Sequence, residues 1–222
     1  MDNRLYVVWL IVAYLIGSVS SAVWFARLKG VDIRKHGSGN AGATNILRVF
    51  GPKAALPVFA FDFLKGLLAV QLIRLTTVSP FVSPELYNGG ELALGVCAVL
   101  GHIFPIFASF KGGKGVATIA GVLMAISPLP MLIALTVFVT VFASTRYVSL
   151  GSICAAVSFP LSVNFLFGMI LKPESTGVTL KIFSVIASIM IVLTHRKNIG
   201  RLRKGTENRI SFKKKSKGEG VL

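Results

Sequence analysis

Apolar stretches of helix length alternate with short polar segments along nearly the whole chain. They lie at about residues 5–28, 54–75, 89–109, 115–127, 130–145, 151–171 and 178–195. A helix needs about 20 apolar residues to cross a bilayer, and fewer when it lies inside a bundle. The pattern therefore predicts an all-α integral membrane protein with seven transmembrane helices rather than a soluble domain.

Three of these stretches have features that affect the number of helices. The stretch at 5–28 is too long for a removed signal peptide and has no cleavage-like end. The stretches at 115–127 and 130–145 are short, with "SPLP" (127–130) between them. Pro128 and Pro130 do not both fit inside one helix, so we expect a tight turn. The alternative, one bent segment, would give six helices.

The positions of the basic residues decide between seven and six helices. Most of the 24 Lys and Arg residues fall at 27–53, 110–114, 144–150 and from 196 onward. With seven helices, all four segments lie on one side of the membrane, whereas six would put the tail on the other. The positive-inside rule therefore predicts an N-terminus outside and a C-terminus in the cytoplasm. We expect a transmembrane domain over 1–196 and a basic cytoplasmic tail over 197–222.

Composition then limits the classes of function. A formal charge of +16 in a soluble protein would suggest nucleic acid. Here 54% of the residues are hydrophobic and the charges are confined to the connections, so the charge indicates topology and anionic ligands, and no nucleic-acid partner is expected. Cys97 and Cys154 lie within apolar stretches, which predicts buried thiols rather than disulfides or metal ligands.

Four polar clusters would share the cytoplasmic side. They are "KHGSGNAGATNILR" (35–48), "FKGGKGVAT" (110–118), "RYVSLGS" (146–152) and "HRKNIGRLRKGTEN" (195–208). Together they offer backbone N–H groups in glycine turns, hydroxyls, amides, Lys and Arg, but little carboxylate. This set of groups is typical of a phosphate site.

Two nucleotide motifs are suggested by these clusters and excluded by their context. Gly37, Gly39 and Gly42 form G-x-G-x-x-G, but an apolar helix precedes them where a dinucleotide fold needs a strand. The "GGKG" segment is not a nucleoside triphosphatase loop, because Gly115 follows Lys114 where Ser or Thr is required. Both motifs nevertheless remain compatible with phosphate.

Individual charged residues also have a structural interpretation. Asp62 and Lys65 lie three residues apart inside an apolar helix, where charges are costly, so a structural ion pair is favoured. His102 is interpreted as structural, whereas His195 and Asn198 lie on one helical face at the cytoplasmic end. No spacing of His, Cys, Asp and Glu supports a metal.

Three sequence blocks resemble a known family. "GSGNAGATNILR", "GHIFPIFASFKGGKGVAT" and "HRKNIGRLRKGTE" occur in the order, and with the apolar layout, of the bacterial acyl-phosphate:glycerol-3-phosphate acyltransferases (PlsY). The resemblance implies transfer of a fatty acyl group from acyl phosphate to the 1-hydroxyl of glycerol 3-phosphate. The products would be 1-acylglycerol 3-phosphate (lysophosphatidic acid) and inorganic phosphate, at the cytoplasmic face of the bacterial inner membrane.

The residues fit this reaction. Both substrates carry a phosphate, and the fatty chain can enter from membrane lipid. An acyl phosphate is already activated, so no cofactor, ATP or coenzyme A is expected. The H-x-x-x-x-D motif of another glycerolipid acyltransferase family is not present. One candidate partner is the enzyme that makes the acyl phosphate.

The family pattern assigns roles residue by residue. The glycerol phosphate and the reacting centre are assigned Ser38, Arg48, Lys111, Ser149, His195 and Asn198. Substrate binding through the two glycine loops is assigned Gly37, Gly39, Asn40, Asn45, Gly112, Gly113, Lys114, Gly115 and Thr118. Asn40 and Asn45 either shape the first loop or contact substrate. His195 is either a general base or a phosphate ligand, and we slightly favour the second, with an acyl-phosphate oxygen taking the hydroxyl proton.

A transporter and a lipid-binding scaffold are the two alternative classes of function. A transporter of phosphorylated metabolites or anionic lipid would use the same basic clusters at its entrance. Such carriers usually have inverted repeats and a site at the membrane midplane, whereas these clusters gather on one side. A scaffold that binds anionic lipid would leave the glycine- and asparagine-rich loop without a use.

Overall fold

The computed structural model describes residues 3–75, 84–166 and 177–210, and every regular element in them is helical. The α-helices are α1 (Asn3–Ser18), α2 (Ser21–Leu28), α3 (Ala43–Phe50), α4 (Pro52–Gln71), α5 (Pro84–Ile103), α6 (Val116–Ile126), α7 (Pro128–Thr145), α8 (Val148–Leu161), α10 (Val178–Thr194) and α11 (Arg196–Arg203). Short 3-10 turns lie at Ile33–Lys35, Leu72–Leu75 and Ile106–Ala108, and a π-turn at Ser162–Leu166 follows α8.

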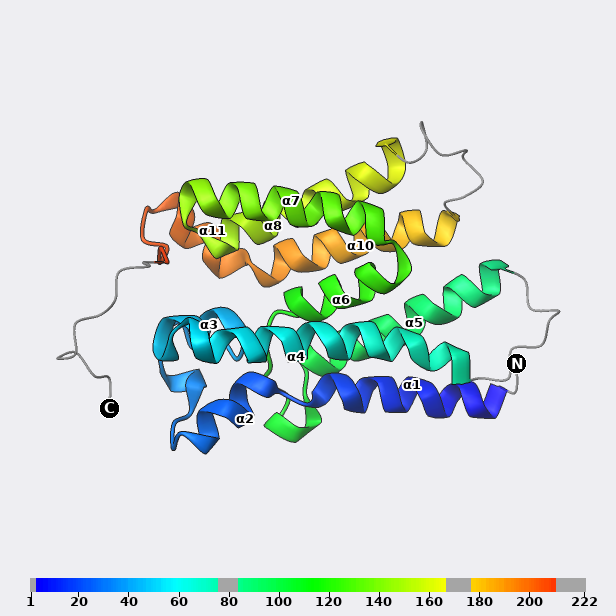
Figure 1. Ribbon diagram of the computed structural model, residues 1–222, viewed down its shortest axis with the longest axis horizontal. Helices are drawn as coiled ribbons and strands as arrows, with labels where there is room; N and C mark the ends of the chain where they lie inside the picture. Colours follow the sequence, from blue (N-terminus) through cyan, green and yellow to red (C-terminus); the bar gives the residue numbers. More distant parts are fainter. Residues whose placement is uncertain (1–2, 76–83, 167–176, 211–222) are drawn as a thin grey trace.

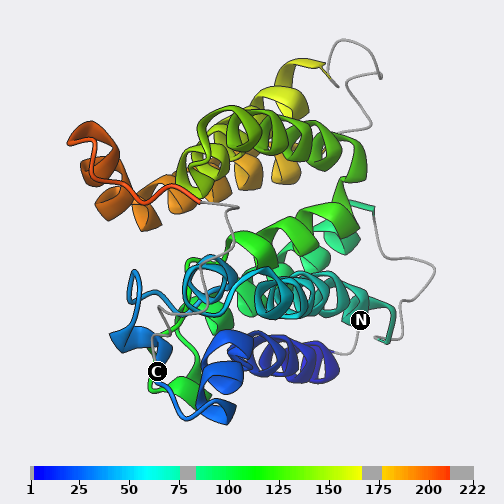
Figure 2. The ribbon, with the colours of Figure 1, turned by 60° about the vertical axis from the view of Figure 1, so that its left-hand side comes forward.

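The helices form two packed groups. In the first, α1 packs on α5 and α4 packs on α6; in the second, α8 packs between α7 and α10. Figure 2 shows the groups as two layers, and contacts of α6 with α7 and of α5 with α10 join them. The short helices α2, α3 and α11 lie at the same end of the bundle, on the left of Figure 1. The polar segments of the sequence are therefore gathered at one end.

Close packing of α4 on α6 depends on two glycines. A Cβ on Gly66 would lie 2.1 Å from the carbonyl oxygen of Thr118, and one on Gly121 would lie 1.9 Å from that of Phe63. Only glycine permits such an approach of two helix backbones. The contact fixes α6, and with it the loop that precedes α6, against the first group.

The predicted single helix at 5–28 is wrong in one respect, because it is broken between α1 and α2. The two helices meet at an angle of 40°. In the break, the carbonyl of Val19 accepts a hydrogen bond from Lys65 Nζ at 2.9 Å. The break leaves this carbonyl without a helical partner, and the buried lysine supplies the missing hydrogen bond. The local sequence does not reveal this contact.

The predicted ion pair between Asp62 and Lys65 is confirmed. Lys65 Nζ lies 2.8 Å from Asp62 Oδ1, and both residues are buried. Ser21 Oγ donates to the same carboxylate oxygen at 2.9 Å, and His102 Nδ1 lies 3.6 Å from it. The cluster ties α2, α4 and α5 together, and the charges are paired as burial requires.

The helix lengths bound the number of spans. Within residues 3–75, 84–166 and 177–210, four helical segments are long and apolar enough to cross a membrane, or up to six if the bent pairs α1–α2 and α10–α11 each count as one. At 11 residues, α6 is about 16 Å long, less than the roughly 30 Å hydrocarbon core. Seven spans and the orientation of the termini stay predictions.

Several boundaries differ from the expected ones. The turn at "SPLP" is confirmed, since α6 ends at Ile126 and α7 begins at Pro128, where the fixed φ of proline suits a first helical residue. α8 begins at Val148 rather than 151, and residues 167–171 of that predicted helix lie outside the described residues. The short helices α3 and α11 were not predicted.

Loss of the counter-charge of Lys65 tests the buried cluster. Asp62→Ala leaves the ammonium buried without its carboxylate, so we expect a loss of about 3–5 kcal/mol of stability. The midpoint of thermal unfolding in detergent should fall accordingly. The double variant Asp62→Leu/Lys65→Met removes both charges and should regain part of the midpoint, the remainder being lost because the Val19 carbonyl no longer has its lysine donor. A double variant as unstable as Asp62→Ala would contradict this role.

Candidate functional site

A cavity of about 710 Å³ lies between the two helix groups. At one end its wall is polar, formed by the loop before α3, the loop before α6, the start of α8 and the α10–α11 junction. Its remaining wall is apolar, from α6, α7, α8 and α10. Phe59 of α4 and Leu135 of α7 line the cavity and are also 46% and 39% exposed, so the cavity opens sideways between these helices.

The loop before α3 is held by Asn45. This buried side chain accepts a hydrogen bond from Ser38 N at 2.8 Å and donates to the carbonyls of Ile33 and His36 at 3.0 and 2.9 Å. Gly37 has φ +60°, and a Cβ there would lie 2.3 Å from Asn45 Oδ1. Of the two alternatives left open, Asn45 shapes the loop, whereas Asn40 lines the cavity.

The "GGKG" loop is folded back on the end of α5. The N–H groups of Gly112 and Gly113 donate to the carbonyls of Ile103 and His102, both at 3.2 Å. Gly115, with φ +78°, then turns the chain into α6. The N–H groups that lack intrahelical partners are therefore those of the first turn of α6, where Val116 and Ala117 line the cavity.

Glu207 gathers the polar side chains from α8 and α11. Its buried carboxylate accepts hydrogen bonds from Ser149 Oγ at 3.0 Å, Asn198 Nδ2 at 2.8 Å and Arg201 Nε at 2.7 Å. Burial alone would raise the pKa of Glu207, but the hydrogen bonds from Asn198, Arg201 and Ser149 outweigh it and hold that pKa below its ordinary value. Glu207 is therefore a carboxylate at neutral pH.

The same network reaches Lys114. Lys114 Nζ donates to Asn198 Oδ1, whose amide nitrogen already donates to Glu207. Burial lowers the pKa of Lys114 to about 8; the charge of Glu207 opposes this shift, and the charges of Arg201 and Arg48 add to it. Lys114 is therefore a cation that can titrate near physiological pH.

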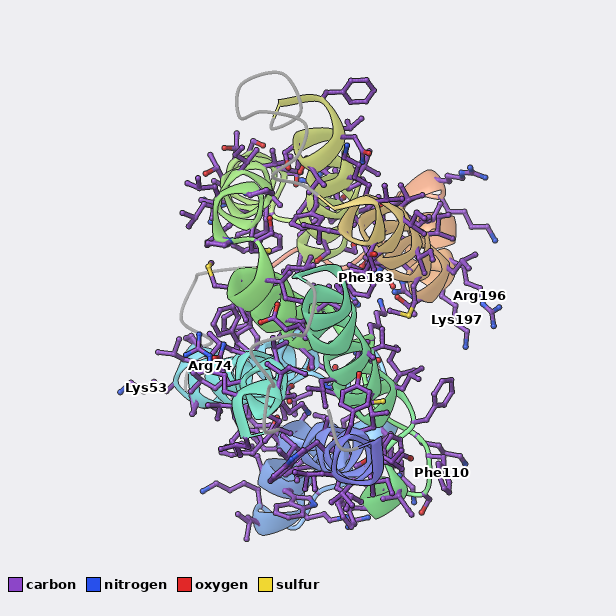
Figure 3. All side chains as sticks on the ribbon, turned by 90° about the vertical axis from the view of Figure 1, so that its right-hand side faces the viewer. Lys53, Arg74, Phe110, Phe183, Arg196 and Lys197 are labelled. Atoms are coloured by element: carbon purple, nitrogen blue, oxygen red, sulfur yellow. The ribbon has the colours of Figure 1, made fainter. Side chains whose placement is uncertain are left out.

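Arg48 completes the cationic group. Its Nη2 lies 3.7 Å from Glu207 Oε1, and its buried Nε has no hydrogen-bond partner in the described part of the chain. Burial lowers the pKa of Arg48, yet a guanidinium stays protonated. Arg196 and Lys197 extend the cationic wall outward: they line the cavity, are exposed, and point away from the helices in Figure 3.

His195 lies buried in the break between α10 and α11. Its Nδ1 is 2.8 Å from the carbonyl oxygen of Ile191, which can only accept, so Nδ1 carries the proton. Burial, and then the charge of Lys114, lower the pKa of His195 to about 4, although the Ile191 bond and Glu207 oppose the shift. The ring is therefore neutral, with Nε2 as a hydrogen-bond acceptor.

The structure brings together most of the predicted site residues. Those on the cavity wall are Ser38, Gly39, Asn40, Arg48, Gly113, Lys114, Gly115, Ser149, His195 and Asn198. Those outside it are Gly37, Asn45, Lys111, Gly112 and Thr118. Lys111 is exposed, whereas Lys114, three residues on, belongs to the network.

Glu207 and Arg201 were not assigned roles from the sequence. Both belong to the block "HRKNIGRLRKGTE", in which Glu207 is the one acidic residue, and that isolation among cations is the signal that could have identified it. They also show that the predicted division at residue 196 does not separate the site from the tail, because Asn198, Arg201 and Glu207 belong to the network. Among the described residues, no group of three or more His, Cys, Asp or Glu could hold a metal.

An apolar cavity with a cationic end, set among helices that cross a membrane, defines an integral membrane protein whose site suits an amphiphilic anion. The profile of the glycerol-3-phosphate acyltransferase family matches residues 7–205, and the chain belongs to this family.

Relatives and solved structures agree with this membership. The chain is 44% identical to a glycerol-3-phosphate acyltransferase of Chlorobaculum parvum, over 92% of this chain and 96% of that one, and 46% identical to one of Salinibacter ruber, over 91% of each. A crystal structure of PlsY, an integral membrane glycerol 3-phosphate acyltransferase, in its glycerol 3-phosphate form is 39% identical with a TM-score of 0.78, over 93% and 96% of the two chains. The lysophosphatidic acid form gives 38% and 0.75, over 93% and 95%.

The coupling of Glu207 to Lys114 predicts a pH effect. We expect kcat/KM of the acyltransferase to fall as pH rises through about 8, as Lys114 loses its proton. Glu207→Gln removes the charge that raises the pKa of Lys114, so this alkaline limb should move to lower pH. Lys114→Arg should move it to higher pH, because a guanidinium keeps its charge. An identical limb in all three proteins would show that Lys114 does not control it.

Proposed function

We propose that this protein transfers a fatty acyl group from acyl phosphate to the 1-hydroxyl of glycerol 3-phosphate. One observation carries the proposal: three buried or half-buried cations, Arg48, Lys114 and Arg201, surround one carboxylate, that of Glu207, at the polar end of an apolar cavity. The excess of positive charge suits a phosphate dianion, and the apolar wall suits a fatty chain. The crystal structures of PlsY in glycerol 3-phosphate and lysophosphatidic acid forms support the same acceptor and product here.

The chemistry needs little beyond positioning and charge. The 1-hydroxyl oxygen forms a bond with the acyl carbonyl carbon, and the bond from that carbon to the phosphate oxygen breaks. Lys114 and the first N–H groups of α6 are placed to stabilise charge on the carbonyl and on the departing phosphate. Arg48 and Arg201 are left for the phosphate of the acceptor.

The proton of the hydroxyl needs a destination. His195 presents Nε2 as an acceptor, but a pKa of about 4 makes it a weak base in the free enzyme. The acyl phosphate carries anionic oxygens that become more basic as its bond to the acyl carbon breaks, because the group leaves as inorganic phosphate. We therefore infer a substrate-assisted reaction, in which His195 orients the hydroxyl and an acyl-phosphate oxygen takes the proton. The protonated phosphate then leaves as inorganic phosphate.

The site also suggests the side of the membrane. The cationic end carries the basic segments that the positive-inside rule places in the cytoplasm, so the active site would face the cytoplasm of a bacterial inner membrane. Acyl phosphate would enter from lipid past Phe59 and Leu135, and glycerol 3-phosphate would enter from water past Arg196 and Lys197.

A single assay tests the donor and the reaction. Purified protein in detergent should convert acyl phosphate and glycerol 3-phosphate into lysophosphatidic acid and one equivalent of inorganic phosphate. Acyl-coenzyme A should not replace acyl phosphate. Product formation from acyl-coenzyme A at a similar rate would contradict the proposed donor, and glycerol 3-phosphate flux into vesicles without any acylated product would favour a transporter.

Two lysines of one loop give a matched test of the site. Lys114→Ala should lower kcat/KM about 10²–10³-fold, the usual cost of removing one group that stabilises developing charge. Lys111→Ala, which removes an exposed lysine outside the cavity, should stay within about threefold of wild type. Equal losses in the two variants would contradict the assignment of Lys114. Circular dichroism and elution volume serve as the controls for folding.

A further inference from the structure

The apolar part of the cavity has a definite length. On α8 its wall runs from Ser149 at the polar end to Phe159, and on α10 from His195 to Ser184. Each distance is roughly ten helical residues, or about 15 Å at ~1.5 Å per residue. Two helices of opposite direction thus give the same depth. It equals about half of the ~30 Å hydrocarbon core, which is the depth that one lipid acyl chain occupies in a leaflet.

The far end of the cavity is closed by packed side chains. Phe159 of α8 is 2% exposed, and Leu123 of α6 and Met131 of α7 are 4% and 8% exposed on the facing helices. All three line the cavity and belong to one hydrophobic core. Val163, one turn beyond Phe159, is fully buried in this core and is not on the cavity wall. The cavity therefore ends at the level of Phe159.

The wall above this floor includes a small residue on each of three helices. Ala134 of α7, Ala156 of α8 and Ala187 of α10 all face the cavity, and each is at most 6% exposed. Small side chains on three packed helices leave room for a chain between them, whereas the large side chains of Phe159 and Met131 fill that room at the end. The width and the depth of the cavity are thus set by different residues.

We propose that Phe159, with Met131 opposite, sets the longest acyl chain that the enzyme accepts. This inference rests on the proposed acyl transfer, because the acyl carbon must lie at the polar end for the chain to reach the floor. A chain that ends before Phe159 gains packing contacts with the cavity wall for each methylene that it adds. A chain longer than the cavity must bend or leave part of its length outside, and gains nothing further.

Substitutions at three positions of one helix test the floor. Phe159→Ala or Phe159→Leu opens the space toward Val163, by up to one helical turn of about 5 Å, and should move the maximum of kcat/KM to chains at least two carbons longer. Ala156→Phe raises the floor by about one turn and should move the maximum to shorter chains by a similar step. Val157→Ala, at a lipid-facing position that is 45% exposed, should leave the maximum in place.

The readout is a ratio within one preparation. Saturated acyl phosphates that differ by two carbons compete for the same enzyme, and the lysophosphatidic acids are separated by mass. A fraction of unfolded protein lowers all products equally and leaves their ratio unchanged. The ratio can therefore be interpreted even if Phe159→Ala is less stable than wild type. Opposite shifts for Phe159→Leu and Ala156→Phe, with none for Val157→Ala, support the floor.

Two results overturn the inference and are distinguishable. An active wild type whose profile of chain lengths is the same in all variants would show that the chain leaves the cavity sideways, past Phe59 and Leu135, and that Phe159 sets no limit. A wild type that forms no lysophosphatidic acid from any acyl phosphate would instead refute the proposed function, on which the inference rests.

Discussion

The carboxylate of Glu207 is the interaction on which the polar end of this protein depends. It is buried, and it accepts hydrogen bonds from Ser149, Asn198 and Arg201. Asn198 in turn accepts a hydrogen bond from Lys114. Without this negative charge, several cations would be confined in a space shielded from water, where their repulsion is strong. Glu207 therefore lets these cations be assembled in one buried site before any anion binds.

The molecule places its buried charges in two different ways. In the cluster of Asp62 and Lys65 each charge has its partner, and the pair joins α4 to the break between α1 and α2. Around Glu207 the cations are in excess, which costs stability but leaves attraction for an anion. The balanced cluster contributes to the fold, and the unbalanced one keeps a net positive charge that can attract an anion.

The two helix groups connect this cationic end to an apolar cavity of leaflet depth. Each group supplies one wall: α4 and α6 with the glycine loop on one side, and α7, α8 and α10 on the other. A reacting acyl group would thus be held by its polar head and its chain at once, and its carbonyl placed by both. In the proposed reaction, this double constraint would orient the reacting atoms.

The sequence by itself determined the membrane class, the turn at "SPLP" and the ion pair of Asp62 with Lys65, and most of the residues that it assigned to the site line the cavity, because apolar length, proline geometry and motif order are local properties. Tertiary structure alone decided three features: that Lys114 of "FKGGKG" joins the network at the cavity, that Asn45 shapes the loop before α3, and that Glu207 lies among the cations. Lys114 and Asn198 meet across 84 residues of chain. Such contacts arise from helix packing, which no local pattern of residues records.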